Sequence, residues 1–174
     1  MKKKEKETNK FIDIIARYSI IILFGFFISF FYTIFTPLTM FMLKLLLRDV
    51  VISGNVIHKN YFIIEIIPAC IGGSAYYLLL ALNLLTPMKI KKRIAFIFLS
   101  FFLFFLFNIL RLFLLISLEI NGIKTYFYHQ FLWYIGSTVF VFLVWIVCIR
   151  IFKVKEIPFV SDFLYLKKLS KQSR

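Results

Sequence analysis

Acidic residues are scarce in this chain, which makes it strongly basic and raises the question of an anionic partner. Among its 174 residues, 8 are Asp or Glu and 22 are Lys or Arg, giving a formal net charge of +14. A nucleic-acid-binding protein would gather such charge on one folded face. Here most of the basic residues instead form three groups that flank apolar runs, at residues 2–10, 89–93 and 150–174. We therefore expect no nucleic-acid partner and interpret these groups as the flanks of membrane-spanning segments.

Cysteine and histidine are also rare, and this limits the available chemistry. The two cysteines, Cys70 and Cys148, form no disulfide framework. The topology described below places them near opposite membrane surfaces, so we expect them not to pair. Cysteine and histidine are too scarce in this sequence for a structural metal cluster. The sequence has no His-Glu-x-x-His zinc motif and no Gly-x-Ser-x-Gly nucleophile elbow. We expect no metal and no other cofactor.

Apolar residues, by contrast, are abundant. The chain is 61% hydrophobic and 20% aromatic, with a mean hydropathy of +0.90, which is too apolar for a soluble domain of this length. About 20 apolar residues are needed to cross the hydrocarbon core, and four segments qualify. They are residues 11–35, 68–86, 94–118 and 128–149. The predicted fold class is therefore all-α: a polytopic transmembrane helical bundle forming one domain over residues 1–174.

The basic groups predict the orientation of this bundle. Lys and Arg accumulate in cytoplasmic segments, so both termini should be cytoplasmic, with 150–174 as a basic tail on the inner membrane surface. The first apolar run is followed by no small-residue cleavage site, so we expect it to be retained. Residues 36–47 are too short to span and contain Lys44, which favours an interfacial or re-entrant helix. The β-branched residues around Gly54-Asn55 predict a small extracytoplasmic hairpin.

Arg111 lies inside the most apolar of these segments. A guanidinium at the centre of a lipid-exposed helix costs roughly 2.5–3.5 kcal/mol on insertion scales, so such a residue usually faces a protein interior or a wet cavity. Seventeen residues beyond Ile94, it stands about 26 Å along a core of roughly 30 Å. Cys70 and His129 fall at the outer starts of the second and fourth segments. All three side chains are therefore expected at the same, extracytoplasmic end of the bundle.

These three residue types suggest nucleophilic catalysis. The thiolate is the reactive form of cysteine, and a nearby cation favours it. The imidazole of His129 could take the thiol proton and return it to a leaving amine. Arg111 would then hold an oxyanion or a substrate carboxylate. Asn108 lies three residues earlier on the same helix face, where its amide could orient the guanidinium or donate to the substrate.

Small and acidic residues nearby complete the candidate site. Gly72 and Gly73 follow the cysteine closely, and they would let another backbone approach, from a neighbouring helix or from a substrate strand. Glu65 and Glu119 are expected at the outer boundary of the membrane. Either could pair with Arg111 or the histidine, or could simply be solvated among the headgroups.

The ordered set of motifs resembles the exosortase/archaeosortase family of membrane-embedded cysteine transpeptidases. The resemblance rests on Glu65-Ile-Ile-Pro-Ala-Cys-Ile-Gly-Gly, on Phe107-Asn-Ile-Leu-Arg-Leu and on Tyr128-His129. It implies that Cys70 corresponds to the nucleophile and Arg111 and His129 to the other two catalytic positions. The sequence departs from the family pattern at Ile71, because Ser or Thr often follows the cysteine, and many relatives have more spans before it.

The resemblance also implies a substrate class. Such proteins are thought to act on surface proteins whose C-terminal sorting signal consists of a short motif, a hydrophobic helix and a basic tail. The signal is cut, and the protein is transferred to an acceptor, for which a membrane lipid is a candidate. The expected protein is thus a multi-pass cell-membrane thiol protease and transpeptidase, of the hydrolase class, with its active site at the extracytoplasmic face.

Other interpretations of the same residues stay open at this point. Cys148 is expected to be an inert packing residue. Arg111 alone could extend to the outer interface, and His129 could belong to an interfacial aromatic belt. His58 is a second histidine, expected to be a solvated turn residue. The alternative function is a non-enzymatic membrane transport or anion-binding protein that uses Arg111, although the chain shows no repeat of the kind found in many transporters.

Overall fold

The computed structural model describes residues 2–26, 28–59, 61–154 and 163, and this part of the chain is mostly helical, at 77%. Its helices are α1 (Lys2–Phe26), α2 (Ile28–Leu46), α3 (Pro68–Ile71), α4 (Gly73–Leu85), α5 (Ile90–Ile120), α6 (Tyr126–Phe131) and α7 (Ser137–Ile151). A π-helix, η1 (Leu132–Gly136), joins α6 to α7. Three short strands precede α3: β1 (Val51–Ser53), β2 (Val56–Lys59) and β3 (Phe62–Glu65).

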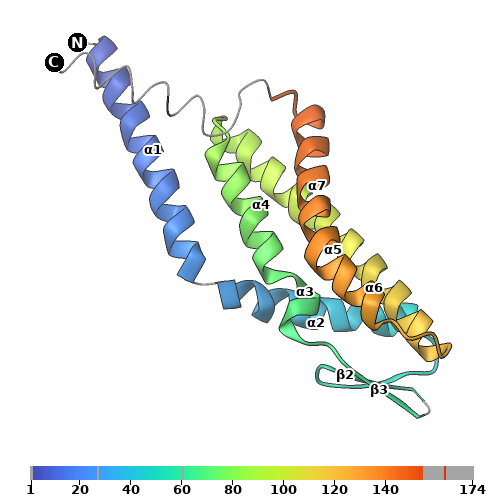
Figure 1. The fold of residues 1–174 in the computed structure, drawn as a ribbon. Coiled ribbons are helices and arrows are strands. Elements are labelled where there is room, and N and C mark those ends of the chain that lie inside the picture. Colours follow the sequence, from blue (N-terminus) through green and yellow to red (C-terminus); the bar gives the residue numbers. More distant parts are fainter. Residues whose placement is uncertain (1, 27, 60, 155–162, 164–174) are drawn as a thin grey trace.

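Helix α4 lies at the centre of the bundle. Figure 1 shows α1, α4, α5 and α7 running along the long axis of the molecule, with α2 crossing near the end that carries the sheet. Helix α4 contacts α1, α2, α5 and α7. Its Tyr76 and Leu79 side chains are fully buried, and Tyr76 stacks on Phe35 of α2 with ring centroids 3.8 Å apart. Aromatic packing around α4 therefore holds the helices together.

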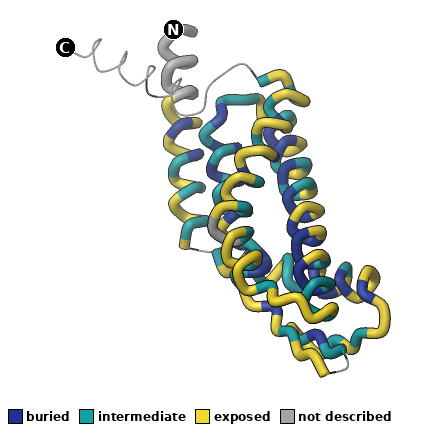
Figure 2. The backbone as a smooth tube through the Cα atoms, turned by 45° about the vertical axis from the view of Figure 1, so that its right-hand side comes forward, coloured by how far each residue is buried: buried dark blue, intermediate teal, exposed yellow. Residues whose placement is uncertain are grey.

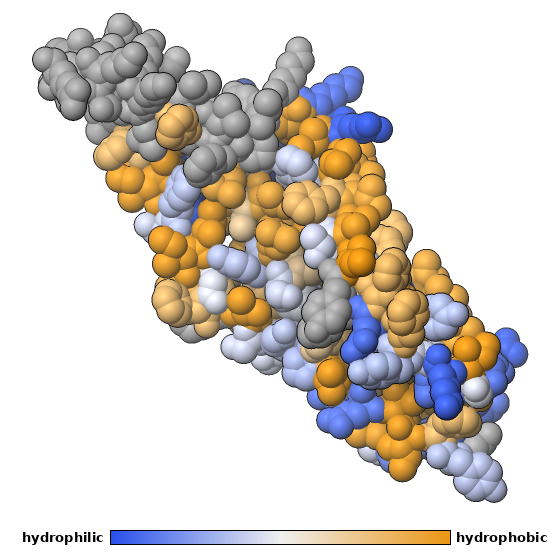
Figure 3. Space-filling model, in the orientation of Figure 1, coloured by the Kyte–Doolittle hydropathy of each residue, from blue (hydrophilic) through white to orange (hydrophobic). Residues whose placement is uncertain are grey.

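The outer surface of the helices is largely apolar. Exposed side chains include Phe26, Ile22 and Phe98, and Figure 2 shows exposed residues along the outward faces of the helices. In Figure 3, hydrophobic residues predominate along the bundle, while strongly hydrophilic ones lie mostly towards its two ends. By length and composition, α2 and α5 are able to cross a membrane, and α4 and α7 are shorter apolar helices. An apolar surface of this extent is suited to lipid contact.

The first apolar run folds differently from the sequence-based expectation, which is one helix over 11–35 and a separate interfacial helix within 36–47. Instead α1 ends at Phe26, and α2 begins at Ile28 and continues through Pro37 to Leu46, changing direction as Figure 1 shows. The reason is tertiary: Phe31 and Phe35 of α2 both stack on Tyr76, which draws α2 across the bundle. Hydropathy alone does not reveal such a turn.

The other three expected segments correspond to helices whose bounds differ from the prediction. The segment expected at 68–86 is divided into α3 and α4 by Gly72, which adopts the left-handed conformation with φ +76°. The segment expected at 94–118 lies within α5. The segment expected at 128–149 comprises parts of α6 and α7 and the π-helix between them. The basic tail expected at 150–174 lies almost entirely outside the described residues.

The predicted hairpin is present and gains a third strand. Strands β1 and β2 are antiparallel and joined by the Gly54-Asn55 turn, in which Gly54 has φ +59°, as two-residue hairpin loops require of a glycine. Strand β3 pairs antiparallel with β2, with Ile57 opposite Ile64; the sequence pattern alone does not predict this strand. The sheet lies beside α3, so it borders the end of the bundle that contains Cys70 (Figure 1).

Candidate active site

Cys70 lies on a helix of a single turn. Pro68 occupies the first turn of α3, where its fixed φ suits a helix start and its missing N–H leaves no donor unpaired. Gly72 ends the helix, and a Cβ at this position would lie 3.3 Å from the ring of Phe104. The turn is therefore short because its last residue is left-handed and tightly packed. Cys70 itself is 6% exposed, at the edge of a cavity described below.

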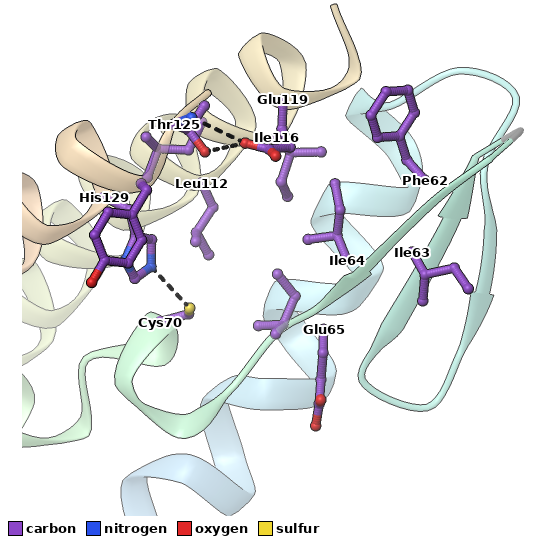
Figure 4. Close-up of a pocket in the computed structure, with 13 residues that line it drawn as sticks. Phe62, Ile63, Ile64, Glu65, Cys70, Leu112, Ile116, Glu119, Thr125 and His129 are labelled. Carbon is purple, nitrogen blue, oxygen red and sulfur yellow. Dashed lines mark hydrogen bonds between the residues drawn. The ribbon is translucent and has the colours of Figure 1, made fainter. Parts of the chain in front are cut away.

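His129 approaches Cys70 from α6. Its Nε2 lies 3.6 Å from the Sγ of Cys70, within hydrogen-bond range for sulfur, and Figure 4 shows the two side chains facing each other. Helix α6 is held against the end of α5 because Glu119 accepts hydrogen bonds from the backbone N–H and the hydroxyl of Thr125. A thiol and an imidazole from residues 59 positions apart thus meet at hydrogen-bond distance.

Arg111 and Asn108 on α5 bind the backbone of the cysteine turn. Arg111 Nη2 donates to the carbonyl oxygen of Cys70 at 3.0 Å, and Asn108 Nδ2 donates to the same oxygen at 3.1 Å and to that of Ile71 at 3.2 Å. Carbonyls at the end of a helix lack intrahelical donors, and a helix of one turn has few of its own. The two α5 side chains therefore cap α3 and fix the position of the cysteine.

Ser137 belongs to the candidate site, although the sequence pattern does not predict it. Arg111 Nη1 donates to the hydroxyl of Ser137 at 3.0 Å, and that hydroxyl donates to the carbonyl of Leu132 at 3.3 Å. Ser137 directly follows the π-helix, a form that often occurs at functional sites. The only sequence signal is a hydroxyl within an apolar run. The Nε of Arg111 has no hydrogen-bond partner among the described residues.

A cavity of about 400 Å³ lies next to the thiol–imidazole pair. Figure 4 shows it between β3 and the ends of α5 and α6. Its lining combines apolar side chains with Cys70, His129 and two carboxylates; the lining residues are Phe62, Ile63, Ile64, Glu65, Ile66, Cys70, Leu112, Leu115, Ile116, Glu119, Thr125, Tyr126 and His129. Arg111 is not among them. Its side chain is 8% exposed, and it contacts the backbone of Cys70 on the side away from the cavity.

The remaining predicted site residues have other surroundings. Glu65 lines the cavity, but its exposed carboxylate points away from Cys70 in Figure 4. Gly73 makes room for the ring of Tyr32, because a Cβ at position 73 would lie 2.9 Å from that ring. The sequence predicts that the paired glycines admit a backbone; the structure shows that aromatic rings from α2 and α5 fill the space instead, because Tyr32 and Phe104 pack around α4.

Cys148 and His58 lie apart from the candidate site at Cys70. Cys70 and Cys148 are both free, as expected, and they belong to different apolar clusters of the core. Cys148 is fully buried. His58 lies on β2 opposite Ile63 and does not line the cavity. Of the candidate groups, the structure therefore brings Cys70, His129, Arg111 and Asn108 together and leaves Cys148 and His58 apart.

This arrangement is suited to chemistry at a carbonyl group. A thiol in contact with an imidazole is the pairing that activates cysteine as a nucleophile. The adjoining cavity has room for a short peptide segment. A guanidinium bound to the carbonyl of the same cysteine places a positive charge next to the cysteine turn.

Comparison with known proteins identifies the family of the chain. No curated protein and no solved structure matches the chain. A family model does match, over residues 15–149: that of the transmembrane exosortases (Exosortase_EpsH). The matched region contains the cysteine turn, the whole of α5 and the segment from α6 into α7. A match over most of the sequence, to a family of membrane proteins, shows that this chain belongs to the transmembrane exosortase family.

Proposed function

We propose that this protein is a membrane cysteine transpeptidase or peptidase that cleaves the C-terminal sorting signal of surface proteins and transfers them to an acceptor through a thioester on Cys70. Membership of the exosortase family supports a membrane transpeptidase at the family level. The observation that carries the proposal further is the 3.6 Å approach of Cys70 Sγ to His129 Nε2 at the wall of a cavity of about 400 Å³.

The first half of the reaction forms the thioester. His129 Nε2 takes the thiol proton while Sγ bonds to the carbonyl carbon of the scissile peptide. The tetrahedral adduct then collapses, and its C–N bond breaks. His129 gives the proton to the leaving amine, which departs with the hydrophobic helix and basic tail of the signal. The rest of the substrate protein remains bound to Cys70 as a thioester.

The second half releases the product. An acceptor nucleophile, a lipid amine or water, loses a proton to His129 as it attacks the thioester carbonyl. The C–S bond breaks, and the sulfur takes the proton back from the imidazole. Transfer to an amine gives a lipid-linked protein, whereas attack by water gives simple hydrolysis.

Arg111 and Asn108 support both halves from behind the nucleophile. Their hydrogen bonds to the carbonyl of Cys70 fix the cysteine turn, and such preorganisation lowers the cost of reaching the reactive geometry. The guanidinium adds a positive charge close to the developing thiolate and oxyanion. We assign Arg111 this role of charge stabilisation, and Asn108 a positioning role.

The membrane sets where the reaction takes place. We propose four crossings with both termini in the cytoplasm, because the basic groups at 2–10, 89–93 and 150–174 all favour that side. The Cys70 end of the bundle then lies at the extracytoplasmic face. A substrate helix that docks laterally against the bundle would bring its cleavage motif to the depth of the thiol, so that membrane depth selects the scissile bond.

The alternative function, anion transport or binding by Arg111, has less support. Two guanidinium nitrogens are engaged by Cys70 and Ser137, and Arg111 does not line the cavity. An anion-binding arginine would direct its donors into open space. The geometry thus favours an arginine that serves the cysteine turn.

The proposal is tested by trapping the thioester. The probe is a designed peptide library with about four randomised residues, an apolar helix of about 20 residues and a lysine tail, mixed with the purified protein in lipid nanodiscs. We expect cleavage between the randomised motif and the helix, and a covalent adduct on Cys70 that hydroxylamine removes. Cleavage that continues in the Cys70→Ala protein would contradict the thioester mechanism.

A further inference from the structure

Strand β3 is an unpaired edge next to the nucleophile. The sheet has the order β1-β2-β3, so β3 pairs with β2 on one side, and no other strand within the described residues pairs with its opposite side. Edge strands expose backbone donors and acceptors, and proteins normally cover, charge or twist such edges. Here the chain continues from β3 directly into the turn that carries Cys70.

The register identifies which backbone groups face outward. The N–H of Ile66 donates to the carbonyl of Asn55 at 2.8 Å, and Glu65 lies opposite Val56. Antiparallel strands exchange hydrogen bonds at every second residue, so Ile64 and Ile66 direct their backbone groups towards β2. Ile63 and Glu65 accordingly direct theirs towards the open side.

This open side faces the cavity. A strand that lines a cavity with one face contributes alternate residues, because successive side chains point to opposite faces. Yet every residue from Phe62 to Ile66 lines this cavity. A consecutive run of lining residues is what the edge of a strand presents. Figure 4 shows β3 on one side of the cavity and the pair of Cys70 and His129 at another.

We propose that the substrate's cleavage motif binds in extended form along the open edge of β3, as an added strand whose scissile carbonyl reaches Cys70. This inference rests on the function proposed above and specifies how the substrate is recognised. Strand addition supplies affinity through main-chain hydrogen bonds and specificity through pockets for alternate side chains. With a rise of about 3.3 Å per residue, the four residues of β3 pair with a motif of about four residues.

The cavity walls set the preferred chemistry of that motif. Leu112, Leu115 and Ile116 of α5 form the wall opposite β3. None of the described lining residues is Lys or Arg, and the carboxylate of Glu119 is already bound by Thr125. The walls offer no Lys or Arg cation to an acidic side chain, and apolar side chains gain from burial against α5. The favoured motif is therefore short, extended and uncharged on the side that faces α5.

The first experiment examines the substrate backbone. Starting from the best-cleaved member of the designed library, each residue of the motif is N-methylated in turn, which removes one main-chain donor and blocks pairing. Because strand pairing uses every second residue, methylation should lower kcat/KM in an alternating pattern. We expect about a fivefold to tenfold loss at paired positions, the effect of about one hydrogen bond, and a smaller loss between them.

The second experiment examines the edge of β3. Ile63→Pro removes an outward N–H, and Ile63→Ala removes the same side chain but keeps that donor, so the ratio of their kcat/KM values isolates the backbone group. The ratio should fall about fivefold to tenfold below one. The matched pair Ile52→Pro and Ile52→Ala, at an outward position on β1 by register, should give a ratio near one. Thermal unfolding verifies that all four proteins are folded.

The outcomes separate this inference from the proposed function. If the wild type cleaves the library and Cys70→Ala does not, but methylation shows no alternation and the Ile63 ratio stays near one, the strand-addition model is overturned while the cysteine mechanism stands. If the wild type cleaves no library member, the proposed function fails and the inference fails with it. Alternation together with a reduced Ile63 ratio establishes β3 as the docking strand.

Discussion

The two ends of the bundle each contain a buried arginine that donates to the backbone of a neighbouring helix. Arg17, 3% exposed, donates through Nη1 to the carbonyl of Leu84 near the end of α4, at 3.1 Å. Arg111 donates to the carbonyl of Cys70 at 3.0 Å. The local device is the same at both ends, since each guanidinium satisfies carbonyls that a helix end leaves without donors.

What surrounds the two arginines differs. Arg17 pairs with the Asp13 carboxylate one turn away, at 3.1 Å. Arg111 has a thiol and an imidazole beside the carbonyl it binds, and an adjoining cavity. The same contrast holds for two buried asparagines: Asn83 donates to Ser100 and Leu79, whereas Asn108 donates to the cysteine turn. Each of these buried polar residues thus links two parts of the bundle. A role in catalysis further requires that the segment it binds carries a nucleophile.

The largest expected effect separates the two cysteines. Cys70→Ala should lower processing of the designed library on the order of 10³-fold or more, because it removes the proposed nucleophile. Cys148→Ala should leave kcat/KM within about twofold at a temperature below its melting point, since this side chain only packs. Cleavage is followed by mass spectrometry. Comparable losses in the two variants would remove the distinction between the two ends of the bundle.

The next effect concerns the histidines. His129→Ala should reduce kcat about 10²- to 10⁴-fold, the range for loss of a general acid–base group, and added imidazole should restore part of the rate. His58→Ala serves as the control and should be close to wild type, because His58 does not line the cavity. A rate that does not respond to imidazole, in a folded His129→Ala protein, would leave the residue without a proton-transfer role.

Arg111 and Arg17 form the third comparison. Arg111→Lys should lower kcat/KM at least about tenfold, because a single ammonium cannot serve both the Cys70 carbonyl and the Ser137 hydroxyl as a planar guanidinium does. Arg17→Lys should reduce the melting temperature and leave kcat/KM of the folded protein unchanged. Full activity of Arg111→Lys would reduce its role to that of a point charge.

The smallest effects should come from the asparagines. Asn108→Ala and Asn83→Ala each leave buried groups without a partner, so both should lower the free energy of unfolding by about 1–3 kcal/mol. Only Asn108→Ala should also reduce kcat, by a few-fold, because it alone loosens the cysteine turn. Thermal unfolding and library cleavage measured on the same samples distinguish the two effects; an equal change in kcat for both would mean that the effect is one of stability.

Much of the candidate site is predictable from the sequence, because the position of a residue along a membrane-spanning helix gives its depth in the membrane. An apolar helix rises about 1.5 Å per residue, so sequence position gives the depth of Arg111, and the basic flanks give the side of the membrane expected. Depth and side together are enough to place Cys70, Arg111 and His129 at one end of the bundle. Depth does not specify direction around a helix, so the sequence does not predict that Ser137 contacts Arg111. Depth also says nothing of strand pairing, so the sequence does not predict that β3 pairs with β2.

The sequence by itself determined that the protein is a helical membrane protein with a hairpin. It also predicted that a thiol, a guanidinium and an imidazole lie at the same depth in the membrane. Hydropathy, charge and helical rise are sufficient for this, because they are properties of the chain. Only the tertiary structure decided that α2 turns across the bundle, that Arg111 binds the backbone of Cys70, and that β3 borders the cavity. These features depend on which side chains pack against each other, as when Phe31 and Phe35 stack on Tyr76. Contacts between distant segments carry no local signal in the sequence.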